Sequence, residues 1–357
     1  MRVRSFLITG CMALVLCGCS DKLPQAPPDP PPSVPARVLY TTSGPGGASI
    51  MVADADGSNR QAIARGALAA RASSGRIAYS RGDSLFVATL ANGVWGERLI
   101  TVLTEEGHYF DRMTIAISPD GRLVTFTTTY NDFLNPMVRR TYLTLADGSS
   151  GLGAPFLVPV AYETTPVFSP DSRSLAFYAS DDPTTFGSSG QVYVASTDGL
   201  TALKPVAPVA EVGNDASMWL DWSPDNKKIV YYSIASGDYG SIYTVGADGA
   251  GRKNIAAGGY PVWSPDGKKI AYISGANVDI LMINADGSGA PENITNTPGS
   301  MELYPQWSPD GRQILYVSYL GDPEHGPGTA RVISVANTSD VKNASETGEI
   351  FKAYWLP

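Results

Sequence analysis

Two histidines, His108 and His325, are the only imidazole groups in this chain of 357 residues. Both fall in predicted loops. A histidine-based metal site needs two or three ligands brought together, and nothing in the spacing of this pair does so. No Gly-x-Ser-x-Gly segment stands at a strand-to-helix turn to present a nucleophilic serine. The glycine-rich segment 44–47 lacks the Lys-Ser/Thr ending of a phosphate-binding loop. We therefore predict no catalytic set, no metal and no cofactor.

The segment 54–59, Asp-Ala-Asp-Gly-Ser-Asn, begins with the oxygen spacing of a calcium-binding loop. The acid that would close such a loop with both carboxylate oxygens is absent. The same Asp-Gly pair returns at 147–148, 198–199, 248–249 and 286–287, between runs of alternating apolar residues. Such a pair is the strongest short-range signal for a β-hairpin. We interpret each of these segments as a hairpin turn.

A second kind of hairpin recurs five times. It consists of a short strand ending in an aromatic residue or Ile, then Ser-Pro-Asp-Gly, then a strand of alternating apolar residues. The five copies span residues 115–128, 166–179, 220–233, 261–274 and 305–318. Proline presets φ at the first central position of a type I turn, and glycine takes the left-handed position that follows. Asn226 replaces this glycine in one copy and tolerates positive φ, whereas Ser172 fits that conformation less well.

Two weaker copies, at 36–43 and 70–80, precede these five. A hairpin with Asp-Gly or Asn-Gly follows each copy except the seventh, so we expect an irregular outer edge over 331–345. Two hairpins make a four-stranded sheet, which is the content of one propeller blade. The second strand of each copy contains one such aromatic residue, so the number of these residues gives the number of blades. They are Tyr40, Tyr79, Phe126, Phe177, Tyr231, Tyr272 and Tyr316.

The repeats predict an all-β fold, a seven-bladed β-propeller over residues 37–357. A six-bladed ring with one degenerate blade is the alternative. The first blade lacks its inner strand, and the end of the chain can supply it, because residues 354–357 align with 262–265. A C-terminal strand paired beside residues 38–40 would close the ring and remove both free sheet edges.

The Ser-Pro-Asp-Gly hairpins, with Trp before the serine and Tyr or Phe eight places after it, resemble the repeats of TolB-type periplasmic propellers. Related repeats occur in tricorn and prolyl-oligopeptidase-type peptidases. The resemblance covers about 37–357 and implies a propeller, but the repeat serves many functions. TolB itself carries an α/β domain before a six-bladed propeller. The peptidases carry a hydrolase domain, for which no residues remain here.

The N-terminus resembles a bacterial lipoprotein signal. Two arginines precede an apolar run over 6–16 that is too short for a permanent membrane anchor, and Leu-Cys-Gly-Cys follows at 16–19. The resemblance implies that residues 1–18 are a signal peptide and that Cys19 carries the lipid, palmitate included. The alternative is an ordinary secretory signal cut near Gly18.

Residues 19–36 are the predicted linker, with seven prolines in the fourteen residues 23–36. Proline favours an extended polyproline helix, so this segment is interpreted as a spacer. Ser20 after the lipidated cysteine resembles the default for the periplasmic side of the outer membrane. Loss of the two signal arginines changes the formal charge from −8 to −10, which does not attract nucleic acid or anionic lipid. We expect a monomer that reaches the membrane through its N-terminal lipid only.

Propellers of this family bind partners on the face that carries the connections between second and third strands and between blades. In this sequence those connections are long, different from one another, and rich in acids and aromatic residues, whereas the turns expected on the opposite face are short and alike. Aromatic anchors among fixed polar groups suit the recognition of a protein or a glycan. The candidate partner-binding residues are Tyr109, Asp111, Tyr162, Glu163, Asp215, Trp219, Tyr260, Glu302 and Tyr304.

These features favour a membrane-anchored, non-catalytic TolB-like lipoprotein that binds a protein partner in the bacterial cell envelope. A carbohydrate or small-ligand receptor, whose aromatic rings stack on sugars, is the first alternative. A propeller-based enzyme such as a polysaccharide lyase is the second, and it needs a metal or a base near the channel.

Overall fold

The computed structural model describes residues 36–44, 47–71, 74–103, 108–110, 115–130, 138–149, 155–156, 162–163, 166–180, 189–198, 203–209, 219–234, 240–275, 278–321, 327–348, 350 and 353–356. Pro35–Pro357 form one compact unit. The regular elements described are all β-strands, and no helix among the described residues could cross a membrane. The predicted signal peptide and all of the predicted linker except Ala36 lie outside these residues.

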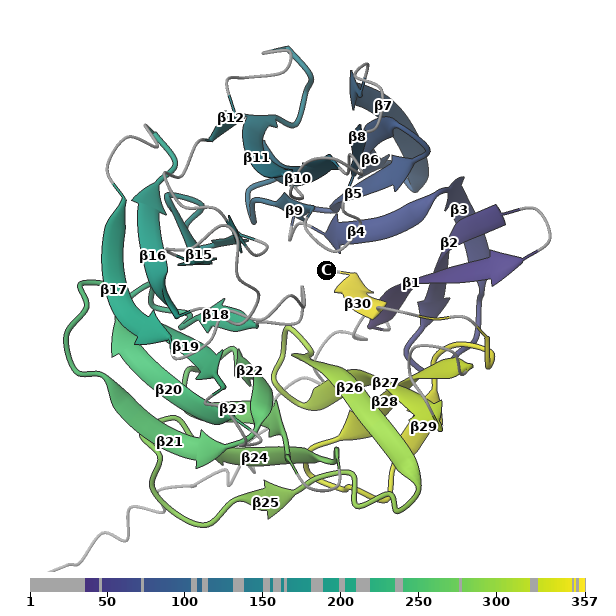
Figure 1. Cartoon of the computed structure of the whole chain (residues 1–357). Helices are drawn as coiled ribbons and strands as arrows, with labels where there is room; N and C mark the ends of the chain where they lie inside the picture. The colour runs from purple at the N-terminus through teal and green to yellow at the C-terminus, as the bar shows by residue number, and fades with distance from the viewer. Residues whose placement is uncertain are drawn as a thin grey trace, which may run out of the picture. The chain divides into compact units, whose positions relative to one another are not determined.

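The described strands form seven antiparallel sheets, which are the blades of a propeller around a central axis (Figure 1). Blade 1 contains, from the axis outward, β30 (Ala353–Leu356), β1 (Arg37–Gly44), β2 (Gly47–Asp54) and β3 (Gln61–Arg65). Blade 2 contains β4 (Ala67–Arg71), β5 (Arg76–Arg81), β6 (Ser84–Ala91) and β7 (Val94–Val102). The prediction of seven blades is confirmed, and the six-bladed alternative is wrong.

Blades 3 and 4 each divide the inner edge between two short strands. Blade 3 contains β8 (His108–Phe110) and β9 (Ala116–Ile117), both paired with β10 (Leu123–Tyr130), then β11 (Val138–Leu145) and β12 (Pro155–Phe156). Blade 4 contains β13 (Tyr162–Glu163) and β14 (Val167–Phe168), both paired with β15 (Ser174–Ser180), then β16 (Gly190–Ser196) and β17 (Lys204–Val209).

Blades 5 to 7 each contain four strands with a single inner strand. Blade 5 contains β18 (Leu220–Trp222), β19 (Lys228–Ser233), β20 (Ser241–Gly246) and β21 (Lys253–Ala257). Blade 6 contains β22 (Gly259–Trp263), β23 (Lys269–Ile273), β24 (Ile280–Asn284) and β25 (Glu292–Asn293). Blade 7 contains β26 (Ser300–Trp307), β27 (Gln313–Leu320), β28 (Gly328–Ser334) and β29 (Val341–Asn343). Its outer edge is thus more regular than expected: β29 forms three pairs with β28, because a turn closed by the Asp340 N–H and the Asn337 carbonyl replaces Asp-Gly.

One hydrogen-bond network explains the Ser-Pro-Asp turns. The Ser118 hydroxyl donates to Asp120 Oδ1 (2.6 Å) and accepts the backbone N–H of Leu123 (2.9 Å). The same two bonds recur in the other four turns, at Ser169, Ser223, Ser264 and Ser308. All five serines are buried, so each hydroxyl finds its donor and acceptor within its own turn. The residue after the aspartate is left-handed in every copy: Gly121, Ser172, Asn226, Gly267 and Gly311.

The two non-glycine residues at this left-handed position connect neighbouring blades. The Asp120 N–H donates to Ser172 Oγ (3.1 Å), and the Asp171 N–H donates to Asn226 Oδ1 (3.0 Å). A glycine at either position would relieve the backbone but lose the acceptor. This bond gives a physical reason for the serine that fits the turn less well.

Hydrophobic cores fill the spaces between blades, and indole N–H groups join the inner strands. Trp222 Nε1 donates to the Val167 carbonyl of blade 4 (3.1 Å). Trp355 Nε1 donates in the same way to the Gln306 carbonyl of blade 7 (3.1 Å). Each of these tryptophans is nearly or completely buried, so one side chain supplies both apolar packing and a bond to the preceding blade.

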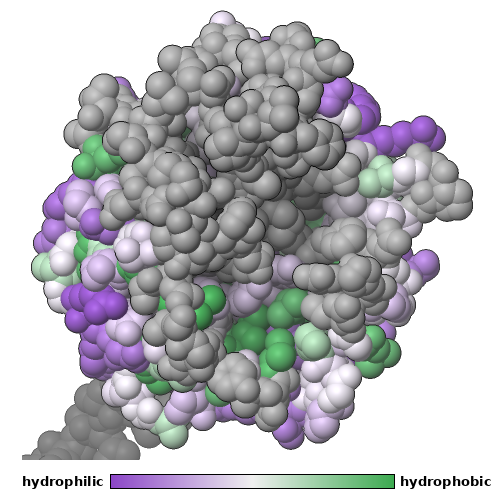
Figure 2. Space-filling model, in the orientation of Figure 1, coloured by the Kyte–Doolittle hydropathy of each residue, from purple (hydrophilic) through white to green (hydrophobic). Residues whose placement is uncertain are grey.

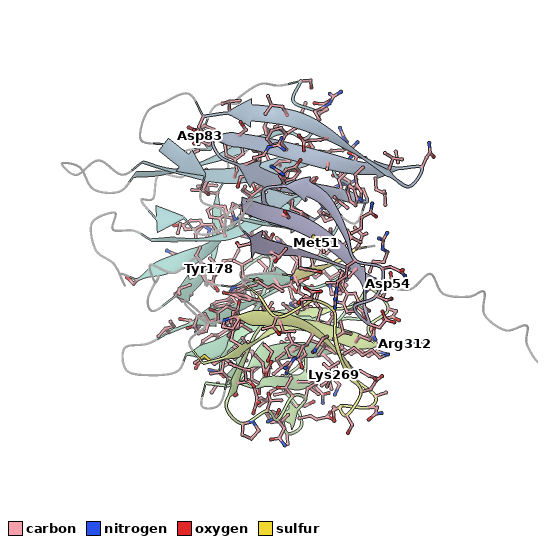
Figure 3. The ribbon with its side chains drawn as sticks, turned by 90° about the vertical axis from the view of Figure 1, so that its right-hand side faces the viewer. Met51, Asp54, Asp83, Tyr178, Lys269 and Arg312 are labelled. Atoms are coloured by element: carbon pink, nitrogen blue, oxygen red, sulfur yellow. The ribbon has the colours of Figure 1, made fainter. Side chains whose placement is uncertain are left out.

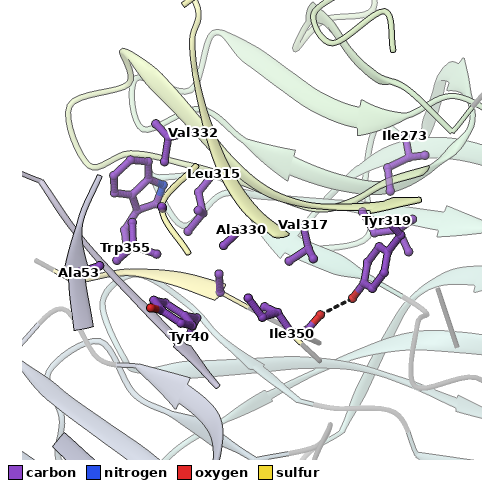
Figure 4. Close-up of a cluster of buried hydrophobic side chains, with 14 residues drawn as sticks. Tyr40, Ala53, Ile273, Leu315, Val317, Tyr319, Ala330, Val332, Ile350 and Trp355 are labelled. Atoms are coloured by element: carbon purple, nitrogen blue, oxygen red, sulfur yellow. Dashed lines mark hydrogen bonds between the residues drawn. The ribbon is translucent and has the colours of Figure 1, made fainter. Parts of the chain in front are cut away.

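The C-terminal strand closes the ring, as the sequence predicts. β30 pairs antiparallel with β1, with Trp355 opposite Val38. Trp355 has no exposed surface and lies in one apolar cluster with Tyr40 and Leu315, which joins blade 7 to blade 1 (Figure 4). The Tyr319 hydroxyl donates to the Ile350 carbonyl in the same cluster (2.7 Å).

The Ser-Pro-Asp turns and the connection between β5 and β6 lie on opposite sides of the ring. Asp54, Lys269 and Arg312, which belong to or border the tight turns, lie on one side of the ring in Figure 3. Asp83, between β5 and β6, lies on the opposite side. We call these sides the turn face and the connection face. Inner strands run toward the turn face, so their first residues lie toward the connection face.

We expect Trp355→Ala to lower the free energy of unfolding by about 3–5 kcal/mol, the range for replacing a large buried aromatic residue by alanine. It also removes the indole bond to Gln306. Urea denaturation followed by circular dichroism measures this loss. The control is Trp95→Ala on the outer strand β7, where the ring is only half-buried and the loss should be less than half as large. Equal losses in both variants would contradict a special role for closure.

Candidate binding site at the channel mouth

Three aromatic residues occupy the same position in three consecutive blades. Trp219, Tyr260 and Tyr304 each lie three residues before the tryptophan that ends the inner strand of blade 5, 6 or 7. Trp219 directly precedes β18 and Tyr260 is the second residue of β22, so both lie toward the connection face, whereas Tyr304 is the fifth of the eight residues of β26. We call them the aromatic trio.

The rings of the trio are in mutual contact. The centroid of Trp219 lies 5.7 Å from that of Tyr260 and 5.7 Å from that of Tyr304, and the two tyrosine centroids lie 5.8 Å apart. Blades 5 and 7 are not neighbours in the ring, so the contact between Trp219 and Tyr304 passes in front of blade 6. The trio therefore lies on the channel side of the inner strands.

Two members of the trio have strained backbones. Tyr260 has φ of +54° and Tyr304 has φ of +59°, a region that a bulky L residue rarely adopts. Both lie in irregular stretches of pairing, between Gly259 and Val262 in β22 and in the corresponding bulge of β26. Bulges re-aim side chains out of the regular strand alternation. The unusual backbone thus turns both rings toward the third.

Val278 adds a third strained position at the same place, with φ of +55°. Its carbonyl accepts the backbone N–H of Glu302 (2.9 Å), and its side chain packs against the same core cluster as Tyr260 and Tyr304. The other described non-glycine residues with positive φ are small and polar: Asn59, Asn92, Ser172, Asn226 and Asn296. Bulky strained residues of the described chain are therefore confined to this region. Such strain gathers at ligand clamps and other functional sites.

Glu302, two residues before Tyr304, is completely buried. Its Oε1 accepts the hydroxyls of Thr297 (2.6 Å) and Ser318 (3.2 Å). Its Oε2 has no hydrogen-bond partner among the described residues. Burial raises the pKa of this carboxyl, and the charge of Arg331 only partly opposes the shift.

Two further carboxylates are close in sequence to Trp219 and Val278. Asp221, in β18, is two residues after Trp219 and accepts the backbone N–H groups of Trp222 (2.9 Å) and Trp263 (2.8 Å). Burial raises the pKa of Asp221 to about 6, although both N–H donors favour its charged form. Asp279, next to Val278, is buried and accepts the Thr297 N–H (3.0 Å).

The structure brings together four of the nine candidate residues, namely Trp219, Tyr260, Glu302 and Tyr304. The backbone of Tyr109 lies in β8, and the backbones of Tyr162 and Glu163 lie in β13. The side chains of these three residues are not among the described ones. Asp111 and Asp215 lie outside the described residues. The sequence analysis missed Asp221, Val278 and Asp279. The sequence did contain a signal for Asp221. This acid directly precedes Trp222, whereas the aligned positions of the next two blades hold Val262 and Gln306.

Figure 2 looks onto the connection face, which is hollowed at its centre. Hydrophobic surface lies beside the hollow, over the region of β22 and β26. No group of three or more His, Cys, Asp or Glu side chains arranged to hold a metal occurs in the described part of the chain. The mouth therefore presents aromatic and apolar surface backed by buried carboxylates.

Seven antiparallel blades closed by a terminal strand define a β-propeller. The family model for the TolB beta propeller domain matches residues 112–357, more than half of the chain. The chain therefore belongs to the TolB β-propeller family. No curated protein matches it.

Solved structures with the same fold have different activities. TolB from Acinetobacter baumannii aligns over 90% of this chain and 67% of its own, at 20% identity and a TM-score of 0.53. Puromycin hydrolase aligns over 87% of this chain at 15% identity and a TM-score of 0.66, but this chain spans only about half (52%) of that enzyme. Oligogalacturonate lyase, in complex with manganese, aligns over 79% of this chain and 82% of its own, at 15% identity and a TM-score of 0.58. At these identities the likeness shows the fold alone.

We expect Tyr304→Gly to be more stable than Tyr304→Ala by about 1 kcal/mol, because both remove the ring but only glycine removes the penalty for positive φ. Urea midpoints of the two variants measure the difference. Tyr243 on β20, which has ordinary strand geometry, is the control: there the alanine variant should be the more stable one. Equal stability of the two Tyr304 variants would contradict backbone strain.

Asp221 is expected to make the protein less stable as pH rises. Its pKa is about 6 in the folded protein and about 3.9 in an unfolded chain. Its contribution to stability is therefore fully present below about pH 4 and lost as pH rises through about 6. Asp221→Asn lacks this titration, so its stability relative to the native protein should improve from about pH 4 to about pH 7.

Urea denaturation at both pH values measures this change. The serine hydroxyl is the largest cause of the lowered pKa at Asp171, Asp225 and Asp266, and these turn aspartates give stability the opposite slope. They are present in both proteins and cancel in the difference. A stability difference that is the same at both pH values would contradict the assignment.

Proposed function

We propose that this chain is a lipid-anchored, non-catalytic propeller of the bacterial cell envelope that binds a protein partner at the mouth of its channel. The observation that carries the proposal is the aromatic trio, held on the connection face by two left-handed tyrosines. Aromatic anchors that are partly buried and rigid supply much of the binding energy at protein interfaces. Membership of the TolB family supports a periplasmic protein-binding role.

Neighbouring surface supports a partner larger than a single small molecule. Leu320, at the end of β27, is 67% exposed and is paired with Ser300 at the start of β26. It therefore lies on the connection face of the blade that carries Tyr304. An exposed leucine on the same blade as Tyr304 fits the apolar part of an interface better than a pocket for a free metabolite.

A carbohydrate receptor is the second candidate. The specific observation in its favour is the trio itself, because partly exposed rings also stack on sugars. The oligogalacturonate lyase shows that this fold occurs in a protein acting on a saccharide. Binding of oligosaccharides to the protein, abolished by Trp219→Ala, would favour this candidate over the first.

We expect a photo-crosslinking residue at position 320 to capture a specific envelope protein in living cells, and the capture to disappear when Trp219→Ala is added. The matched control is the same crosslinker at position 312, which lies at the other end of β27 on the turn face. Mass spectrometry identifies the captured protein. Equal capture at both positions, or capture that ignores Trp219→Ala, would contradict binding at the mouth.

Membrane anchoring is tested separately at Cys19. We expect Cys19→Ser to release the protein from the membrane fraction into the soluble fraction, because the thiol that accepts the lipid is gone. Cell fractionation and labelling with a palmitate analogue provide the measurements. Cys17→Ser is the control, since this cysteine lies inside the expected signal peptide. Retention of Cys19→Ser at the membrane would point to another anchor.

A further inference from the structure

The carboxylates beside the aromatic trio lack a full countercharge. Asp221, Asp279 and Glu302 form no salt bridge with any described Lys or Arg, and the ion pairs found in the described chain lie elsewhere. Their hydrogen bonds come from neutral donors: backbone N–H groups, hydroxyls and the Asn293 amide. Carboxylates held by neutral donors contribute negative charge to this end of the channel.

Among these three carboxylates, Glu302 has an oxygen atom, Oε2, without a described hydrogen-bond partner. Its carboxylate is completely buried, and its Oε2 has no partner among the described residues. Arg331 is electrostatically coupled to it, but Arg331 Nε also lacks a described hydrogen-bond partner. Glu302 has no exposed surface, so its uncompensated charge acts on the channel mouth through space rather than by contact.

The trio provides the other half of a cation site. Its three centroids form a nearly equilateral triangle with sides of 5.7, 5.7 and 5.8 Å. A cation about 4 Å above the centre of this triangle would lie about 5 Å from every centroid, and a cation over the face of a ring is attracted within ~6 Å of its centroid. The described cation–π pairs, Arg81 with Phe86 and Arg252 with Tyr243, lie in blades 2 and 5 and show that this chain uses such contacts.

A sugar fits this arrangement less well. A sugar ring stacks on one flat aromatic face, whereas the two tyrosine rings are inclined at 79° and the tryptophan is tilted by 39° and 42° to them. A neutral sugar also gains little from buried carboxylates. An ammonium or guanidinium group is attracted both by the rings and by the field behind them.

We infer that the channel mouth of this propeller recognises a lysine or arginine side chain of its protein partner, seated on Trp219, Tyr260 and Tyr304 and drawn in by Asp221, Asp279 and Glu302. This inference rests on the proposed function and names the chemistry that the partner presents. The partner is a protein with a basic segment, which matches the acidic net charge of the chain.

Isothermal titration of the full chain in detergent with hexalysine tests the inference, with hexalysine acetylated at every side chain as the uncharged probe. We expect hexalysine to bind and the acetylated peptide not to bind. Trp219→Ala and Glu302→Gln should each weaken hexalysine binding at least tenfold. The second variant keeps the shape of the side chain and removes a buried charge, so it should fold as well as the native protein.

Glu346→Gln is the matched control, because it removes one negative charge from a side chain that is 82% exposed and paired with Arg60. It should change hexalysine affinity less than twofold. Equal weakening by Glu346→Gln and Glu302→Gln would show attraction by net charge alone and overturn the inference. Equal binding of the acetylated peptide, or no binding of hexalysine, would also overturn it. If the inference is overturned but the crosslinker at position 320 still captures the partner, the proposed function remains supported.

Discussion

Closure of the ring is the constraint on which the rest of this structure depends. A four-stranded blade is apolar on both faces and cannot bury them alone, so each blade needs a neighbour on either side. Blade 1 obtains its inner strand from the last residues of the chain, with Trp355 opposite Val38. The same indole reaches the Gln306 carbonyl of blade 7. Four C-terminal residues therefore complete one blade, cover one interface and fix the channel.

The closed ring explains why its two faces take different roles. On the turn face, each Ser-Pro-Asp turn satisfies its serine hydroxyl within the turn, as at Ser118. On the connection face, the inner strands depart from regular pairing at Tyr260 and Tyr304. Left-handed tyrosines persist only where the surrounding structure holds them. Both tyrosines pack against the apolar cluster that joins blade 7 to blade 1, which provides that hold.

The sequence is sufficient to predict the blades because their determinants are local and repeated. A proline, an aspartate and a left-handed residue specify each turn without reference to the rest of the chain, and Trp355 matches Trp263 in an aligned segment. The site is only partly predictable. Trp219 and Tyr304 are visible as aromatic residues in connections, but their contact across blade 6 depends on the curvature of the ring. The left-handed backbone of Val278 has no signal in its residue type, which disfavours that conformation.

The fold alone does not select the ligand, since a TolB protein, a hydrolase and a lyase share it. The residues that select the ligand must therefore be ones that differ between blades, unlike the residues of the turns, which are largely the same from blade to blade. The position three residues before the end of the inner strand meets this condition, because it borders the channel and belongs to no turn network. Blades 5, 6 and 7 place Trp219, Tyr260 and Tyr304 there, whereas the aligned positions of blades 3 and 4 hold Thr114 and Thr165, and that of blade 1 holds Lys352. Under the proposed function, specificity comes from one arc of the mouth, and substitutions there change the ligand without disturbing the interactions that close the ring.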